Sequence, residues 1–184
     1  MDFLNVLQDR RSVRSYKDAL VNQSVIRPLI DAAIAAPSAM NQQPWAFAVC
    51  LNLKRIEELG GGAKDWLLQN LEHTPAELRH MLSDPEFFIF HHAPAFIIVL
   101  ATSSASQATE DCCLAAENLI LAARDKGLAT CWIGLARPWL DLATTKLELG
   151  VPESYRVVAP IILGYPTEWP QSHGRNAPEM FWID

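Results

Sequence analysis

The segment that most constrains the fold is residues 105–126, whose helical pattern is apolar on more than one side. Alanine, leucine, isoleucine and cysteine recur around its circumference instead of forming one stripe, and Gly127 follows it as a C-cap would. A helix of this kind must be buried in a core or packed against a partner chain. The sequence therefore predicts a central helix that is enclosed by its own domain or by a second chain.

The remaining elements alternate between strand and helix patterns. Helical patterns occur before Arg10, at 22–36 and at 137–148. Four apolar runs have the length of strands: 45–51, 93–101, 128–133 and 155–163. Because helices separate most of the strands, a three-layer α/β or α+β sandwich is expected.

The organisation along the chain indicates a single domain over residues 1–184, since no repeat or linker interrupts it. Residues 60–92 have the least regular pattern, and their GGG run suggests a flexible segment that could form a lid over a site. Residues 165–184 are rich in proline and tryptophan and should pack on the protein or on a neighbouring subunit, because aromatic rings favour burial.

Composition excludes several classes of protein. The chain has 15 basic and 21 acidic residues, a net charge of -6 and no basic run, which argues against nucleic acid as a partner. The four cysteines lack C-x-x-C spacing, which indicates free thiols in a reducing compartment. The longest apolar run is well short of the ~20 residues that cross a bilayer, and no signal-peptide pattern opens the chain. We therefore expect a soluble cytoplasmic protein without a membrane partner.

Some polar residues within this pattern need an explanation. No metal site is expected at the histidines. His73 and His80 have no third ligand nearby in the sequence, and His91 and His92 precede a buried strand, where adjacent side chains of an extended chain point opposite ways. Glu117 and Asn118 interrupt the apolar helix and need partners. Those partners would come from a neighbouring subunit, from the loop near residue 38 or from the ordinary core.

Two polar clusters are candidates for binding a ligand. Three arginines and a serine follow the opening helix within five residues, and guanidinium groups bind phosphate in a planar, bidentate way: Arg10, Arg11, Ser12 and Arg14. In the segment APSAMNQQPW (36–45), amide and hydroxyl side chains lie between two prolines that stiffen the loop, an arrangement that can face a flat heteroaromatic ligand. The alternatives are a solvated charged turn and a plain polar turn.

These clusters are the first of five sequence blocks that together resemble the FMN-dependent nitroreductase family. The blocks occur in the family's order: RRSVRSY, AAIAAPSAMNQQPWAFAV, GLATCWIGLARPWL, GVPESYRVVAPIILGYP and GRNAPEMFWI. The resemblance extends from Phe3 to Ile183 and is unclear only over 60–92. It implies an α+β, three-layer α-β-α sandwich that forms an interlocked homodimer with FMN at the subunit interface and residues 165–184 packed on the dimer.

The resemblance also implies roles for particular residues. Arg10 and Ser12 would hold the FMN phosphate with Arg11 beside them, and Arg14 would approach the pyrimidine side of the ring. The loop that borders the ring, usually supplied by the other subunit, corresponds to Pro37, Ser38, Ala39 and Asn41. Backbone amides of Ile133 and Gly134 would face the ring near N5. Arg175 and His173 fall where the family places basic residues for the phosphate, although a lysine is common at the position of His173.

The activity implied is an FMN-dependent oxidoreductase without a catalytic side chain, since the chemistry resides at FMN N5. NAD(P)H would donate hydride and a nitroaromatic, quinone or similar acceptor would be reduced in a second, ping-pong step. A cation such as Arg14 at the pyrimidine edge would stabilise the reduced ring. The alternatives are a same-fold flavin enzyme for dehalogenation, enone reduction or flavin breakdown, and a non-catalytic flavin-binding protein. Without a G-x-G-x-x-G element, the sequence does not distinguish NADH from NADPH.

Overall fold

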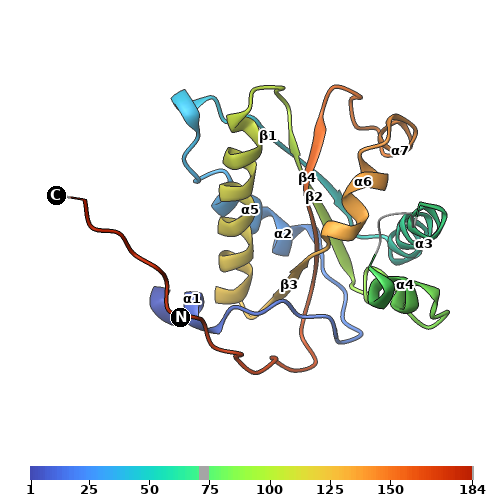
Figure 1. Cartoon of the computed structure of the whole chain (residues 1–184), viewed down its shortest axis with the longest axis horizontal. Coiled ribbons are helices and arrows are strands. Elements are labelled where there is room, and N and C mark those ends of the chain that lie inside the picture. Colours follow the sequence, from blue (N-terminus) through green and yellow to red (C-terminus); the bar gives the residue numbers. More distant parts are fainter. Residues whose placement is uncertain (71–74, 184) are drawn as a thin grey trace.

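A four-stranded antiparallel sheet organises the structure, a computed structural model that describes residues 1–70 and 75–183. The strands lie in the order β1-β2-β4-β3 (Figure 1), and their bounds are Trp45–Cys50 for β1, Ala95–Ala101 for β2, Ala129–Trp132 for β3 and Arg156–Gly164 for β4. All three pairings are antiparallel, with a register shift in β2 between Val99 and Leu100. The fold is therefore of the α+β type.

Helices cover both faces of this sheet (Figure 1). Their bounds are Phe3–Asp9 for α1, Gln23–Ala33 for α2, Leu53–Gln69 for α3, Ala76–Ser83 for α4, Gln107–Asp125 for α5, Arg137–Leu140 for α6 and Ala143–Glu148 for α7. Alternate residues of β2 point to opposite faces, so that Ile97 and Val99 join a core with α2 and α5, whereas Phe96 and Ile98 join a core with α3 and α6. The three-layer arrangement agrees with the sequence expectation.

The predicted strands and the central helix agree with the structure to within two residues at each end. The predicted helix 137–148 is instead divided into α6 and α7, because Leu142 has an extended backbone (φ -63°, ψ 140°). Just before it, the Asp141 carboxylate accepts a hydrogen bond from the Val157 amide of β4 at 2.9 Å. The division therefore ties this helical region to the sheet.

The expectation of a flexible segment at the GGG run is wrong, because Gly60–Gly62 lie inside the 17-residue helix α3. Two of these glycines allow close packing. A Cβ on Gly60 would lie 3.2 Å from Phe90, and one on Gly62 would lie 2.5 Å from Cζ2 of Trp139. The composition that suggested flexibility thus reflects close helix packing. His73 of the candidate metal pair lies outside the described residues.

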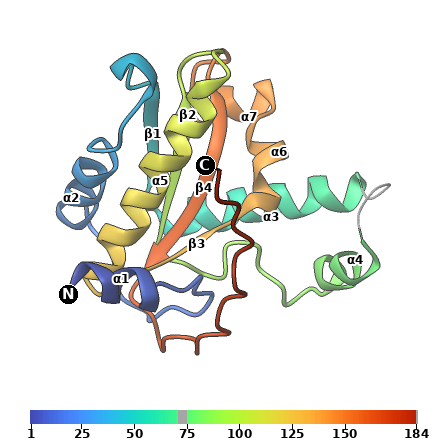
Figure 2. The same cartoon turned by 60° about the vertical axis from the view of Figure 1, so that its left-hand side comes forward.

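Both ends of the chain are attached to the last turn of α5. The ammonium group of Met1 forms an ion pair with Asp125, and Asp9 lies 3.6 Å from Arg124. The Arg124 guanidinium also stacks over the Trp169 ring at 3.7 Å. Beyond Trp169, residues 170–183 are exposed and extend away from the body (Figures 1 and 2). The expected packing of the tail on its own domain therefore holds only as far as Trp169.

The structure also bears on the composition arguments. All four cysteines are free thiols. No helix within residues 1–70 and 75–183 is long and apolar enough to cross a membrane. The same described residues contain no group of three or more histidine, cysteine, aspartate or glutamate side chains placed to hold a metal ion.

The packing of α3 generates a stability prediction. Gly62→Ala should destabilise the protein by about 1–3 kcal/mol, because the added methyl group would overlap the Trp139 ring. Gly61→Ala is the matched control: its Cβ meets nothing within 4 Å, and the gain in helix propensity should stabilise the protein by about 0.5–1 kcal/mol. Urea denaturation of both variants measures the difference, and equal stabilities would contradict the packing shown here.

Candidate functional site

The segment that follows α1 is fixed along the edge of the sheet. Ser12 forms a parallel bridge with Thr130 of β3, and the Val13 amide donates to the Thr130 carbonyl at 3.0 Å. Tyr16 adds a second constraint, since its hydroxyl donates to the Val13 carbonyl at 2.7 Å. Because β3 is the outermost strand, this pairing also covers its free edge.

The three arginines of this segment have different surroundings. The Arg10 Nε lies 4.0 Å from a carboxylate oxygen of Glu117, whereas Arg11 donates from Nη1 to the backbone carbonyls of Gln8 and Arg10. The Nε of Arg11 is buried and has no hydrogen-bond partner among the described residues. Arg14 is exposed on the wall of a small cavity. The guanidinium of Arg11 is thus largely committed to its own chain, whereas that of Arg14 is accessible.

The cavity beside Arg14 has a volume of about 270 Å³. Its other walls include Tyr16, His91 and His92. Both histidines have left-handed backbone conformations (φ 49° and 52°), so they do not lie in an extended chain as the sequence analysis assumed. Burial, with the nearby Arg14 and His92, lowers the pKa of His91 below its usual 6.5, so this imidazole is neutral near pH 7. Burial likewise raises the pKa of the Tyr16 hydroxyl well above its usual value.

The loop after α2 is held against the first turns of α5. The Ala39 amide donates to the Asp111 carboxylate at 3.1 Å, and the Gln43 amide donates to the Ser38 hydroxyl at 2.9 Å. Met40 and Gln43 have left-handed backbones, and Met40 is 91% exposed. Such conformations cost about 1–3 kcal/mol each and cluster at binding sites, where surrounding contacts enforce them. The loop is therefore a strained, exposed surface.

The two amides predicted to face a ligand in the turn after β3 differ in their hydrogen bonding. The Ile133 amide donates to the Pro160 carbonyl at 2.8 Å, which extends the pairing of β3 with β4. It is therefore not available to face a ligand, contrary to the sequence expectation. Gly134 is exposed, and its amide makes no hydrogen bond with any other described residue. Of the two predicted donors, only the Gly134 amide is therefore free to bind a ligand.

The predicted basic residues of the tail are not brought to the arginine segment within one chain. His173 and Arg175 are both exposed, and the Arg175 guanidinium donates to the Gly174 carbonyl beside it at 2.7 Å. The tail has an anchor closer to the site, because the Thr167 hydroxyl donates to the Ser15 hydroxyl at 2.8 Å.

The predicted site residues therefore fall into two groups. Residues 10–14 and Gly134 lie around β3, whereas the loop 37–41 lies at the other end of α5, where Asp111 holds it (Figure 1). Asp9 pairs with Arg124, which is thirteen residues further along this helix than Asp111, or about 20 Å at ~1.5 Å per residue. A single chain therefore presents two half-sites that do not meet.

The structure also identifies supporting residues that the sequence analysis did not single out. Asp111 is 6% exposed and holds the loop, while Arg124 and Trp169 fasten the tail. The sequence feature that could have identified Asp111 is its position, since it is an acidic residue in the first turns of an apolar helix. Asn118, in contrast, donates to the Ala32 carbonyl at 3.2 Å, which is an ordinary core contact, and Glu117 faces Arg10.

Comparison with known proteins assigns the chain to a family. The model of the Nitroreductase family matches residues 7–165, and the chain belongs to that family. A crystal structure of a nitroreductase with bound FMN from Bacteroides fragilis matches with a TM-score of 0.87 and 27% identity, over 100% of both chains. An iodotyrosine deiodinase bound to FMN and 3-iodo-L-tyrosine matches with a TM-score of 0.80 and 22% identity, over 99% of both chains, which shows a common fold.

Curated relatives match over short segments. A protein from Methanothermobacter thermautotrophicus, provisionally named NADH dehydrogenase/NAD(P)H nitroreductase, is 39% identical over 59 residues, which are 32% of this chain and 31% of that protein. The NADH dehydrogenase of Thermus thermophilus is 45% identical over 40 residues, 22% of this chain and 20% of its own length. The chain thus aligns with less than a third of these two relatives.

The anchoring of the loop generates a second prediction. Asp111→Ala should lower the free energy of unfolding by about 1–3 kcal/mol and speed amide exchange at Ala39, because a backbone donor loses its acceptor. Asp111→Asn is the matched control, since its side-chain oxygen can still accept this bond. Urea denaturation and hydrogen exchange measure both effects. Unchanged exchange at Ala39 in the alanine variant would show that another group holds the loop.

Proposed function

We propose that this chain is an FMN-dependent oxidoreductase that functions as a homodimer and transfers reducing equivalents from NAD(P)H to small acceptors such as nitroaromatics or quinones. One observation carries the proposal: the arginine segment 10–14 is fixed on the sheet edge of a fold that matches the FMN-bound Bacteroides fragilis nitroreductase over its full length. The relatives named as NADH dehydrogenases support a nicotinamide donor.

The donors around β3 fit the chemistry of FMN, which joins an anionic phosphate to a flat ring. Arg10 and Ser12 would bind the phosphate, with the unpartnered Nε of Arg11 close behind them. Arg14 would meet the pyrimidine edge, and the free Gly134 amide would donate to the ring. When bound, FMN supplies two-electron redox chemistry at N5, which matches a site without a catalytic side chain.

Arg14 is the residue with the clearest effect on this chemistry. The Tyr16 hydroxyl is protonated and bonded to Val13, and the neighbouring His91 is neutral near pH 7. Arg14 is the arginine of this wall, which also includes Glu86, and its side chain is exposed to a ligand. A fixed cation at that edge favours the state of the ring that carries negative charge.

A two-fold homodimer would join the two half-sites. If the α5 helices of two subunits pack antiparallel, the loop 37–41 of one chain approaches the arginine segment of the other. Exposed apolar side chains support such an interface, since large apolar patches mark contact surfaces. They lie on α1, on α5 and in the tail: Phe3, Leu4, Leu7, Leu114, Met180, Phe181, Trp182 and Ile183.

We further propose that residues 1–184 act as one domain and that residues 165–184 pack on the dimer, where the part beyond Trp169 would contact the partner subunit. In that arrangement Arg175 and His173 would reach the phosphate of the partner's site, which they do not approach in their own chain. Residues 84–92, part of the candidate lid, would border the ring through the cavity beside Arg14.

Visible spectroscopy of the purified protein tests the function. The protein, as isolated or after addition of FMN, should show a flavin spectrum that bleaches when NADH or NADPH is added without oxygen. A stable yellow colour with both donors would instead favour a non-catalytic flavin-binding protein. Failure to bind FMN at all would overturn the proposal.

The third prediction concerns the reduction potential. Arg14→Ala should make reduction of the bound flavin harder by an amount worth about 1–3 kcal/mol, because the pyrimidine edge loses its cation. Arg14→Lys should retain most of the effect, and Arg27→Ala, an exposed arginine on α2, is the control. Spectroelectrochemical titration measures the midpoint potential. An unchanged potential in the alanine variant would remove Arg14 from this role.

A further inference from the structure

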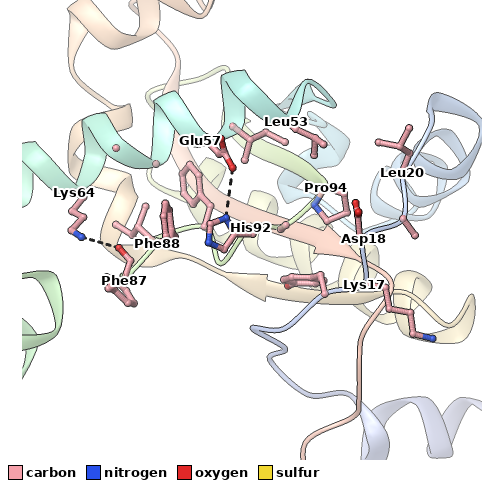
Figure 3. A pocket seen from close by; sticks show the side chains of 18 of the residues that line it. Lys17, Asp18, Leu20, Leu53, Glu57, Lys64, Phe87, Phe88, His92 and Pro94 are labelled. Carbon is pink, nitrogen blue, oxygen red and sulfur yellow. Dashed lines mark hydrogen bonds and ion pairs between the residues drawn. The ribbon is translucent and has the colours of Figure 1, made fainter. Parts of the chain in front are cut away.

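A second, larger cavity lies between α3 and residues 85–94, and residues 17–20 border it (Figure 3). Its volume is about 380 Å³, which is within the range of small-molecule sites. Apart from residues 85–92, which also reach the cavity beside Arg14, none of the residues proposed to contact FMN lines it. It shares a wall with the smaller cavity beside Arg14, and the shared residues are Tyr16, Phe87, Phe88 and His92.

The space exists because α3 presents glycines to it. Gly60 approaches the Phe90 ring closely, but a Cβ on Gly61 would meet no atom within 4 Å. The other side of the cavity is formed mainly by apolar side chains, among them Ile56, Phe87, Phe88, Phe90 and Pro94. Aromatic walls of this kind favour a flat ring, which can stack on them or meet their edges.

The rim of the cavity is apolar as well. Leu20 is 74% exposed, Leu53 is 42% exposed and Phe88 is 43% exposed, and all three line this cavity. An exposed apolar rim around a concave site is unfavourable in water unless a ligand or a partner covers it. Because the rim continues into an enclosed volume and not onto a flat face, a small molecule fits it better than a protein surface.

The charged groups on the wall are either partnered or balanced: Lys17 and Asp18, at the exposed edge of the cavity, carry opposite charges. Nδ1 of His92 lies 3.6 Å from a Glu57 carboxylate oxygen (Figure 3). The Lys64 ammonium donates to the carbonyls of Asp84 at 2.6 Å and Phe87 at 2.9 Å. The charges of Lys17, Lys64, Asp18 and Glu57 cancel, so a charged ligand would lose its hydration without gaining a net counter-charge from the wall, which is costly. The wall therefore selects an uncharged ligand.

We propose that this cavity is a second binding site, for a flat, uncharged aromatic molecule of one or two fused rings. The occupant would stack between Gly61 of α3 and the three phenylalanines Phe87, Phe88 and Phe90. The side chains shared by the two cavities would separate this occupant from Arg14. The site does not depend on the proposed flavin function, because its walls on α3 and at residues 17–20 include no residue assigned to the flavin, although residues 85–92 also reach the cavity beside Arg14.

Binding of 2-naphthol, which is uncharged at neutral pH, tests the proposal on the purified full-length protein. Equilibrium dialysis should give saturable binding of one molecule per chain. The affinity for 2-naphthoate, the anionic counterpart of naphthol, should be lower by about tenfold or more. Gly61→Leu adds a side chain whose Cβ would meet no atom within 4 Å and should weaken naphthol binding by about tenfold or more. Gln69→Leu, on an exposed position of the same helix, should bind like the parent.

A second measurement locates the ligand in the unmodified protein. Nuclear Overhauser effects should connect the naphthol protons with the methyl groups of Leu20, Leu53 and Ile56. Absence of saturable binding would overturn the proposal. So would binding that Gly61→Leu leaves intact, or Overhauser contacts confined to other residues. Naphthoate binding as tightly as naphthol would overturn the assignment to uncharged ligands.

Discussion

The pairing of residues 12 and 13 with Thr130 is the interaction on which the candidate site depends. Two short backbone contacts place three arginines along the outer edge of the sheet. Without them, Arg10 and Arg14 would belong to a loop that has no fixed position relative to Gly134, which follows the same strand. The Tyr16 hydroxyl reinforces the arrangement through its bond to Val13. The sheet thus acts as a rigid support, and a few polar groups at its margin supply the binding chemistry.

Much of the fold could be predicted from the sequence because its strands are short, apolar and bounded by polar residues. The strand 95–101 is buried at every position, and the apolar helix now labelled α5 lies against the sheet. The GGG run predicted flexibility wrongly, because the sequence does not distinguish a glycine required by the close approach of Trp139 from a glycine in a flexible segment. The interruption at Asp141 depends on a contact with Val157 that no local pattern contains.

The site could be predicted only in part, for a related reason. Motifs identified the arginine segment and the loop 37–41, but they did not reveal that the Ile133 amide donates its hydrogen bond to the Pro160 carbonyl. Nor did they indicate that Asp111, a residue 72 positions from Ala39, holds the loop. Such contacts join distant parts of the chain, so they become visible only when the strands and helices are placed together. The larger cavity also depends on distant parts of the chain, since Gly61 and Phe88 line it from separate segments.

The last turn of α5 holds the amino-terminal helix and the carboxyl-terminal segment together, through Arg124 and Asp125. One guanidinium contacts both Asp9 and Trp169, so a substitution of Arg124 would weaken the attachment of both segments at once, while the contacts of Met1 with Asp125 and of Thr167 with Ser15 would remain. The segment that carries Arg10 and the one that carries Arg175 are thereby mechanically linked, although no direct bond joins them. The same helix end thus supports the segment before Arg10 and the tail as far as Trp169.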